Sequence, residues 1–145
     1  MHNKQKGVSL LELMIVVAIV AIISAFAYPS YMRYIVNTKR SAATSALLQI
    51  ADRQQQFFMD NKRFTNDLTV LGFAANPLIL KDDGNSTVAG DPDAVYSVSL
   101  SNVAATTYTI TAAPLNGQGR DTECASLTLT QAGTRGSSAG GADCW

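Results

Sequence analysis

The sequence predicts an α+β fold in which one long N-terminal helix packs on a small antiparallel β-sheet. Three observations support this fold: an apolar block from Val8 to Ala27, a later stripe of apolar residues at helical spacing, and segments in which apolar and hydroxyl residues alternate. Apolar residues every three or four positions indicate a helix, and strict alternation indicates a half-buried strand. A helix and a sheet that each carry one apolar face bury those faces against each other.

The first segment has the composition of a membrane span. Lys4 and Lys6 lie just ahead of the apolar block, and basic residues in this position place the N-terminal side in the cytoplasm. A helix from Val8 to Tyr28 contains 21 residues. At 1.5 Å per residue it rises about 32 Å, enough to cross a hydrocarbon core of about 30 Å.

Glu12 is the only charged residue in this block. An ionised side chain at mid-bilayer is unfavourable by about 2 to 3 kcal/mol, so such a residue indicates a function with a specific partner. The alternative is that Glu12 lies close enough to one end of the span to reach the lipid headgroups.

The same residues resemble the class III signal of type IV prepilins. Gly7 stands directly before the apolar block, Glu12 is the fifth residue after that glycine, and Pro29 lies where these proteins usually carry a proline. The resemblance continues through Tyr28-Pro29-Ser30-Tyr31 and ends at Asp143-Cys144-Trp145. The combined pattern looks most like a minor pilin of the PilE-like type.

The resemblance implies how the N-terminus is processed and used. A prepilin peptidase would cut between Gly7 and Val8 on the cytoplasmic side and then methylate the new amine of Val8. Glu12 would pair with the N-terminal amine of an adjacent subunit during assembly. Pro29 removes a backbone donor and disturbs the preceding turn, so we expect a bend between Ala25 and Pro29.

An ordinary secretory signal is the alternative for this segment. Ala25-Phe26-Ala27 has the A-x-A form of a leader-peptidase site, and cleavage there would release a protein that begins at Tyr28. Glu12 is unusually early for a signal that is discarded, and the helical pattern continues across this site. Both observations favour the prepilin interpretation.

We expect four segments: a leader at residues 1–7, the transmembrane and assembly half of the helix at 8–28, its amphipathic half at 29–61, and a globular head at 62–145. Asn61 is the expected helix end. The apolar stripe of the amphipathic half contains Ala43, Ala46, Leu47, Ile50, Gln54 and Phe57. The expected water-facing side contains Arg33, Lys39, Arg40, Asp52, Arg53 and Gln55. Arg33, Lys39 and Arg40 are expected either to contact lipid headgroups or to pair with a neighbouring subunit.

Three strands are expected in the head, at residues 96–101, 107–112 and 126–130, where apolar and hydroxyl residues alternate. Thr65 to Leu68 predicts a cap that opens a short turn ending at Gly72. Residues 74–93 and 133–143 are expected to be loops, and a fourth strand, usual in pilins, has no assigned position. The acidic residues of the loop at 74–93 suggest a calcium site. Their spacing, however, does not match an EF-hand, which favours a solvated loop.

Cys124 and Cys144 are the only cysteines. In a domain outside the cytoplasm, two cysteines favour a disulfide over a metal pair. The bond would close a loop of about 20 residues, worth roughly 3 kcal/mol. In pilins such a bridge delimits the C-terminal surface region, and the resemblance assigns that role to Cys124 and Cys144.

Charge and composition argue against several function classes. Loss of the leader removes Lys4 and Lys6, which leaves nine basic against 11 acidic side chains and a formal charge of −2. A nucleic-acid module normally carries a basic excess, so nucleic acid is expected only as an indirect partner. The only histidine, His2, lies in the leader, so no serine has a histidine to activate it after cleavage. We expect no enzyme, no cofactor and no metal.

The resemblance implies a minor structural subunit of a type IV pilus, contributing to assembly and so to twitching motility, adhesion or DNA uptake. Its partners would be the prepilin peptidase, the inner-membrane assembly platform, and the major and other minor pilins of a helical fibre. It would first cross the bacterial inner membrane once, with its head in the periplasm, and then enter the cell-surface pilus. A type II secretion pseudopilin and a secreted binding domain are the alternatives, and Asp143-Cys144-Trp145 favours the pilus.

Overall fold

The computed structural model describes residues 7–145, so most of the expected leader, including His2, Lys4 and Lys6, lies outside the described residues. The chain divides into two compact units, Met1–Ile35 and Val36–Trp145. One helix, α1 (Leu10–Asn61), contributes to both. The other elements, all in the second unit, are β1 (Leu78–Lys81), β2 (Ser86–Thr87), β3 (Ala94–Ser101), β4 (Thr109–Pro114), the 3-10 helix η1 (Asn116–Arg120), β5 (Leu127–Thr130) and β6 (Arg135–Ser137).

The first unit contains the apolar part of α1. Among the described residues, α1 is the one helix long and apolar enough to cross a membrane, and none of its most apolar window is buried within the chain. Pro29 lies inside α1, which continues through it. The bend near Pro29 remains a prediction.

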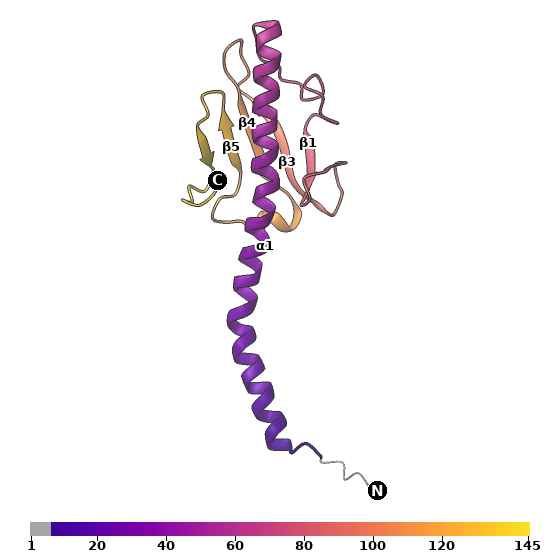
Figure 1. The fold of residues 1–145 in the computed structure, drawn as a ribbon, viewed down its shortest axis with the longest axis vertical. Helices are drawn as coiled ribbons and strands as arrows, with labels where there is room; N and C mark the ends of the chain where they lie inside the picture. Colours follow the sequence, from indigo (N-terminus) through magenta and orange to yellow (C-terminus); the bar gives the residue numbers. More distant parts are fainter. Residues whose placement is uncertain (1–6) are drawn as a thin grey trace. The chain divides into compact units, whose positions relative to one another are not determined.

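The second unit is an antiparallel sheet in the order β2-β1-β3-β4-β5-β6. Figure 1 shows the C-terminal part of α1 lying across this sheet. The three expected strands are confirmed as β3, β4 and β5, with Ala112 facing both Val98 and Leu127 in neighbouring strands. The α+β fold predicted from the sequence is therefore the observed one.

The two expected loops are wrong in part, because both contain strands. Residues 74–93 include the hairpin of β1 and β2, and residues 133–143 include β6. Leu78, Ile79 and Leu80 are all buried, so β1 has no alternation of apolar and polar residues that would indicate a strand. β2 and β6 have only two and three residues, too few for a pattern.

The core lies between α1 and the sheet. Ala43, Leu47 and Ile50 have no exposed surface and belong to one apolar cluster with the inner face of the strands. The Phe64 ring stacks on Phe58 at 4.8 Å between centroids and meets the edge of Tyr108 at 4.7 Å. The predicted stripe is confirmed, with Phe57 half-buried at its end.

Two boundaries are confirmed and one side-chain assignment is wrong. α1 ends at Asn61, and Gly72, at φ +87°, ends the short turn in which Leu71 N donates to Leu68 O. Arg40, expected to face water, is only 5% exposed. The reason is its position: Arg40 lies three residues before Ala43 and therefore on the buried face of the helix.

Candidate functional site

Gly7 and Val8 lie just before α1, and both are exposed. Among residues 7–145, a Cβ added at Gly7 would meet no atom within 4 Å. The fold therefore does not require glycine at position 7. Cleavage between Gly7 and Val8 and methylation of Val8 remain predictions.

Glu12 lies in the first turn of α1, where Leu13 N donates to Ser9 O at 3.1 Å. A carboxylate is favoured there by the partial positive charge of the helix N-terminus. Glu12 is exposed, and within residues 7–145 its carboxylate has no hydrogen bond or ion pair. The predicted pairing requires a second subunit and remains a prediction.

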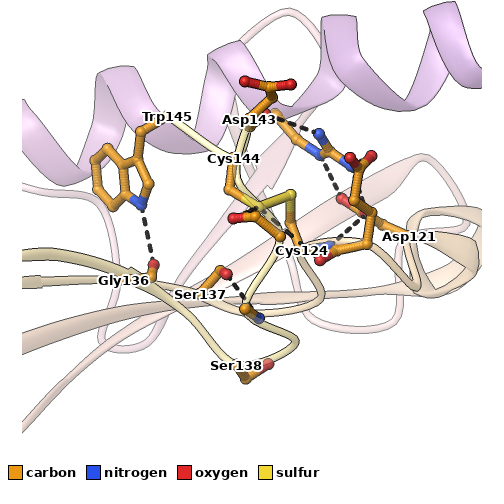
Figure 2. The surroundings of a disulfide bond; sticks show 12 residues. Asp121, Cys124, Gly136, Ser137, Ser138, Asp143, Cys144 and Trp145 are labelled. Atoms are coloured by element: carbon orange, nitrogen blue, oxygen red, sulfur yellow. Dashed lines mark hydrogen bonds and ion pairs between the residues drawn. A yellow bond between two sulfur atoms is a disulfide. The ribbon is translucent and has the colours of Figure 1, made fainter.

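Cys124 and Cys144 form the predicted disulfide, with 5.6 Å between their Cα atoms and a sequence separation of 20. Both are buried. Figure 2 shows the bond beneath α1, with Asp121 to its right, Trp145 to its left and Asp143 above it. We call residues 121–145 the C-terminal region.

Within the C-terminal region, residues 139–141 are hydrogen-bonded to residues 123–124. Gly141 N donates to Glu123 O at 3.1 Å, and Ala139 N donates to Cys124 O at 3.4 Å. A Cβ at Gly141 would lie 2.5 Å from Glu123 O, so this close approach requires glycine. No local sequence pattern indicates this role of Gly141, because the contact is made across 18 residues.

Arg40 connects α1 to the C-terminal region through four hydrogen bonds. Its Nε and Nη2 donate to the two carboxylate oxygens of Asp121, each at 2.6 Å. Nη2 also donates to Glu123 Oε2 at 3.2 Å, and Nη1 donates to Asp143 O at 3.3 Å. The guanidinium therefore contacts both segments that carry the cysteines.

The surroundings of this pair favour the charged forms of both groups. Burial alone would raise the pKa of Asp121, but the hydrogen bonds from Arg40 and from Cys124 N outweigh it and lower that pKa. The hydrogen bond to Asp121 raises the pKa of Arg40 above its ordinary value, against the effect of burial. Because each charge has several partners, desolvation is offset.

Gln118 makes a second connection to α1. It is 1% exposed, and its Nε2 donates to Val36 O at 3.2 Å and to the Tyr96 hydroxyl at 2.9 Å. Burial raises the pKa of Tyr96 and keeps its hydroxyl neutral. The amide thereby joins α1, η1 and β3 at one point.

Trp145 lies against the edge of the sheet. Its Nε1 donates to Gly136 O at 2.9 Å (Figure 2), and the Arg135 guanidinium lies 5.4 Å from the ring centroid. This distance is typical of a cation–π contact. Trp145 thus fixes the end of the C-terminal region to β6.

The acidic loop considered for calcium forms local pairs. Asp83 accepts from Asn85 N at 2.9 Å, and Asp91 accepts from the Thr87 hydroxyl and from Lys81 Nζ, the latter at 3.3 Å. Among residues 7–145, no group of three or more His, Cys, Asp or Glu side chains is arranged to hold a metal ion.

Comparison with known proteins identifies the family. A family model described as "Type IV minor pilin ComP, DNA uptake sequence receptor" matches residues 29–128, more than half of the chain. A model of the prokaryotic N-terminal methylation motif matches residues 2–28. The chain therefore belongs to the type IV pilin family, and within it to the group that the ComP model describes.

The related proteins are pilins. A type IV major fimbrial protein, FimA of Dichelobacter nodosus, is 38% identical over 101 residues, which cover 67% of this chain and 60% of FimA. The major pilin PilE1 of Neisseria gonorrhoeae is 35% identical over 85 residues, covering 56% of this chain and 49% of PilE1. PilA of Myxococcus xanthus is 35% identical over 73 residues, covering 50% of this chain and 33% of PilA. The chain thus spans between a third and three fifths of these relatives.

A solved structure confirms the fold. A type IV pilin from Shewanella oneidensis superposes with a TM-score of 0.51 at 20% identity, covering 76% of this chain and 97% of that protein. At this identity the likeness concerns the fold alone. It agrees with the long helix and antiparallel sheet described above.

Proposed function

We propose that this protein is a minor subunit of a type IV pilus. The observation that carries the proposal is the N-terminal methylation motif over residues 2–28, followed in α1 by an apolar segment that is not buried within the described chain. An apolar helix of this length can lie in a bilayer or pack among other such helices. The minor role is supported by the ComP family match, while the relatives named above are major pilins.

The proposed pathway begins in the inner membrane. The chain crosses it once with its head in the periplasm, and a prepilin peptidase cuts between Gly7 and Val8 and methylates Val8. An inner-membrane assembly platform then transfers the subunit into a helical fibre of major and other minor pilins. The exposed position of both residues ahead of α1 is compatible with access by a peptidase.

Glu12 is the proposed assembly residue. In a bundle of packed apolar helices its carboxylate is unfavourable alone and favourable beside the amine of an adjacent subunit, because attraction between opposite charges grows as the dielectric falls. This pairing would set the axial register of the subunit. The role proposed for the protein is structural.

DNA uptake is the second candidate function. The observation that favours it is the description of the matching family as a DNA uptake sequence receptor. The formal charge of −2 after leader removal does not by itself attract DNA. Binding of the purified chain to a duplex that carries the uptake sequence, compared with a scrambled duplex, tests this candidate; equal binding to both would contradict it.

Two measurements test the main proposal. Intact-mass analysis of the membrane-purified protein should give a chain that starts at Val8 and carries one extra methyl group. Mass spectrometry of sheared pili should find the protein as a minor component beside the major pilin. A chain starting at Tyr28 would indicate a secreted binding domain, and recovery only with secretion pseudopili would indicate a type II secretion pseudopilin.

A further inference from the structure

We propose that Arg40 is the positioning residue that brings the Cys124 and Cys144 segments together, so that the disulfide closes on a surface already organised by α1. The guanidinium bonds with Asp121, three residues before Cys124, and with Asp143, directly before Cys144. Arg40 and Asp121 are 81 residues apart in sequence. One side chain of the helix therefore holds both ends of the loop that the disulfide closes.

The contact reaches the first cysteine through Asp121. Asp121 Oδ1 accepts from Arg40 Nη2 at 2.6 Å and from Cys124 N at 3.1 Å. The Asp121 side chain is 1% exposed and that of Arg40 7% exposed. Because both groups are sheltered from water, competition from solvent is weak and the orientation of the Cys124 backbone is fixed.

The contact reaches the second cysteine through the main chain. Arg40 Nη1 donates to Asp143 O, and Gly141 N donates to Glu123 O, so residues 141–143 lie beside residues 121–123. Glu123, whose side chain is more than half exposed, adds a weaker partner to the same guanidinium. With these bonds formed, the two sulfur atoms are neighbours before any bond joins them.

Closure then proceeds by thiol–disulfide exchange. One cysteine thiolate attacks a low-molecular-weight disulfide such as oxidised glutathione, which forms a mixed disulfide and releases one glutathione thiolate. The second cysteine thiolate displaces the other glutathione. The two cysteines lose two electrons, one molecule of oxidised glutathione is reduced to two thiols, and the protons of the cysteines pass to them. Preorganisation by Arg40 speeds the second, intramolecular displacement.

Oxidative refolding of the full chain in detergent micelles tests the proposal. The reduced, unfolded protein is diluted into oxidised glutathione, and free thiols are alkylated at intervals and counted by mass. We expect Arg40→Met to slow closure by about tenfold or more and the mixed disulfide to accumulate. A tenfold change corresponds to the free energy of about one charge-assisted hydrogen bond. Arg53→Met is the matched control, because Arg53 is another arginine of α1 and bonds to Leu71 O instead. Equal closure rates for wild type and Arg40→Met would overturn the proposal.

A second experiment removes the disulfide itself. With Cys124→Ser and Cys144→Ser combined, Arg40 should still hold residues 121–145, so their amides should exchange at least about tenfold more slowly than when Arg40→Met is added. The amides of β3 and β4 report whether the rest of the head is folded. Equal exchange of residues 121–145 in the two proteins, with β3 and β4 protected in both, would contradict the proposal.

Arg40→Lys addresses the case in which Arg40→Met unfolds the whole head. Lysine keeps the positive charge but cannot donate to both Asp121 oxygens and to Asp143 O in one planar arrangement. We expect closure slower than in wild type with β3 and β4 still protected. Closure at the wild-type rate would overturn the proposal.

Discussion

The side-chain amide of Gln54 forms two hydrogen bonds with the main chain of Thr65. Gln54 Nε2 donates to Thr65 O at 2.6 Å, and Thr65 N donates to Gln54 Oε1 at 3.1 Å. Gln54 has no exposed surface. Gln54, a residue of the apolar stripe of α1, thus supplies hydrogen-bond partners to the main chain where it turns back from the helix toward the sheet.

Gln54→Leu should therefore lower the free energy of unfolding by about 1 to 3 kcal/mol, because both main-chain groups of Thr65 lose their partner. Denaturant unfolding of the full chain in detergent micelles measures this. Gln56→Leu is the control: Gln56 is exposed and, within residues 7–145, its side chain bonds only to Asp52, so a change below about 0.5 kcal/mol is expected. Similar effects of the two substitutions would contradict this role of Gln54.

Stability should fall in acid partly through Asp121. The pKa of Asp121 is lowered in the folded state, so its contribution is complete above the ordinary value of 3.8 and is lost as the pH falls through the lowered pKa. The pKa values of Asp67, Asp83 and Asp91 are lowered as well and act in the same direction.

Unfolding measured from pH 7 down to pH 3 should show a smaller acid-induced loss for Asp121→Asn than for wild type. The substitution should itself cost about 3 to 5 kcal/mol at neutral pH, because it leaves the buried Arg40 charge without its main partner. An identical pH profile for both proteins would show that Asp121 titrates alike in the folded and unfolded states.

Cys124→Ser or Cys144→Ser should lower the free energy of unfolding by about 2 to 4 kcal/mol. Membrane insertion should be unchanged, because it depends on the apolar part of α1. Denaturant unfolding and the membrane fraction are the two measurements. A stability equal to that of wild type after either substitution would contradict the expected contribution of the disulfide.

Gly141→Ala should destabilise the head by about 1 to 3 kcal/mol, because the new methyl group would collide with the Glu123 carbonyl and force the backbone to move. Gly117→Ala is the matched control, since a Cβ at Gly117 meets no atom of the described part of the chain within 4 Å. Thermal unfolding of both variants measures the difference. Equal melting temperatures would mean that the loop relaxes without cost.

Glu12→Gln should leave membrane levels and leader cleavage largely normal but strongly reduce the amount of the protein in sheared pili. The amide keeps the shape of the side chain and removes the charge that would pair with a neighbouring amine. Quantitative mass spectrometry of the membrane and pilus fractions separates these steps. Equal incorporation of Glu12→Gln and wild type would support a glutamate that only reaches the headgroups.

The sequence predicted those parts of the fold in which a local pattern repeats over several residues. β3, β4 and β5 alternate, and α1 ends at Asn61, so these elements could be read from neighbouring residues. β1 could not, because Leu78, Ile79 and Leu80 are all buried and give no alternation. β2 and β6 exist through their pairing with β1 and β5.

The residues of the candidate site likewise fall into those that a local sequence pattern indicates and those that none does. The N-terminal residues form a compact sequence motif, and the two cysteines have few alternatives for pairing. Arg40 and Asp121 meet across 81 residues, and no local pattern indicates such a partner. The position of Arg40 three residues before Ala43 was the available signal, since it places an arginine on the apolar face.

The hydrogen bond between Trp145 and Gly136 also affects whether the sheets of neighbouring head domains can join when many copies lie close together. An edge strand with free carbonyl groups can accept another strand and start sheet-to-sheet aggregation. β6 has only three residues, and the carbonyl of its central residue is already bonded to the indole. β6 is therefore a poor template for an added strand, and extension of the sheet at this edge is disfavoured even at high local concentration.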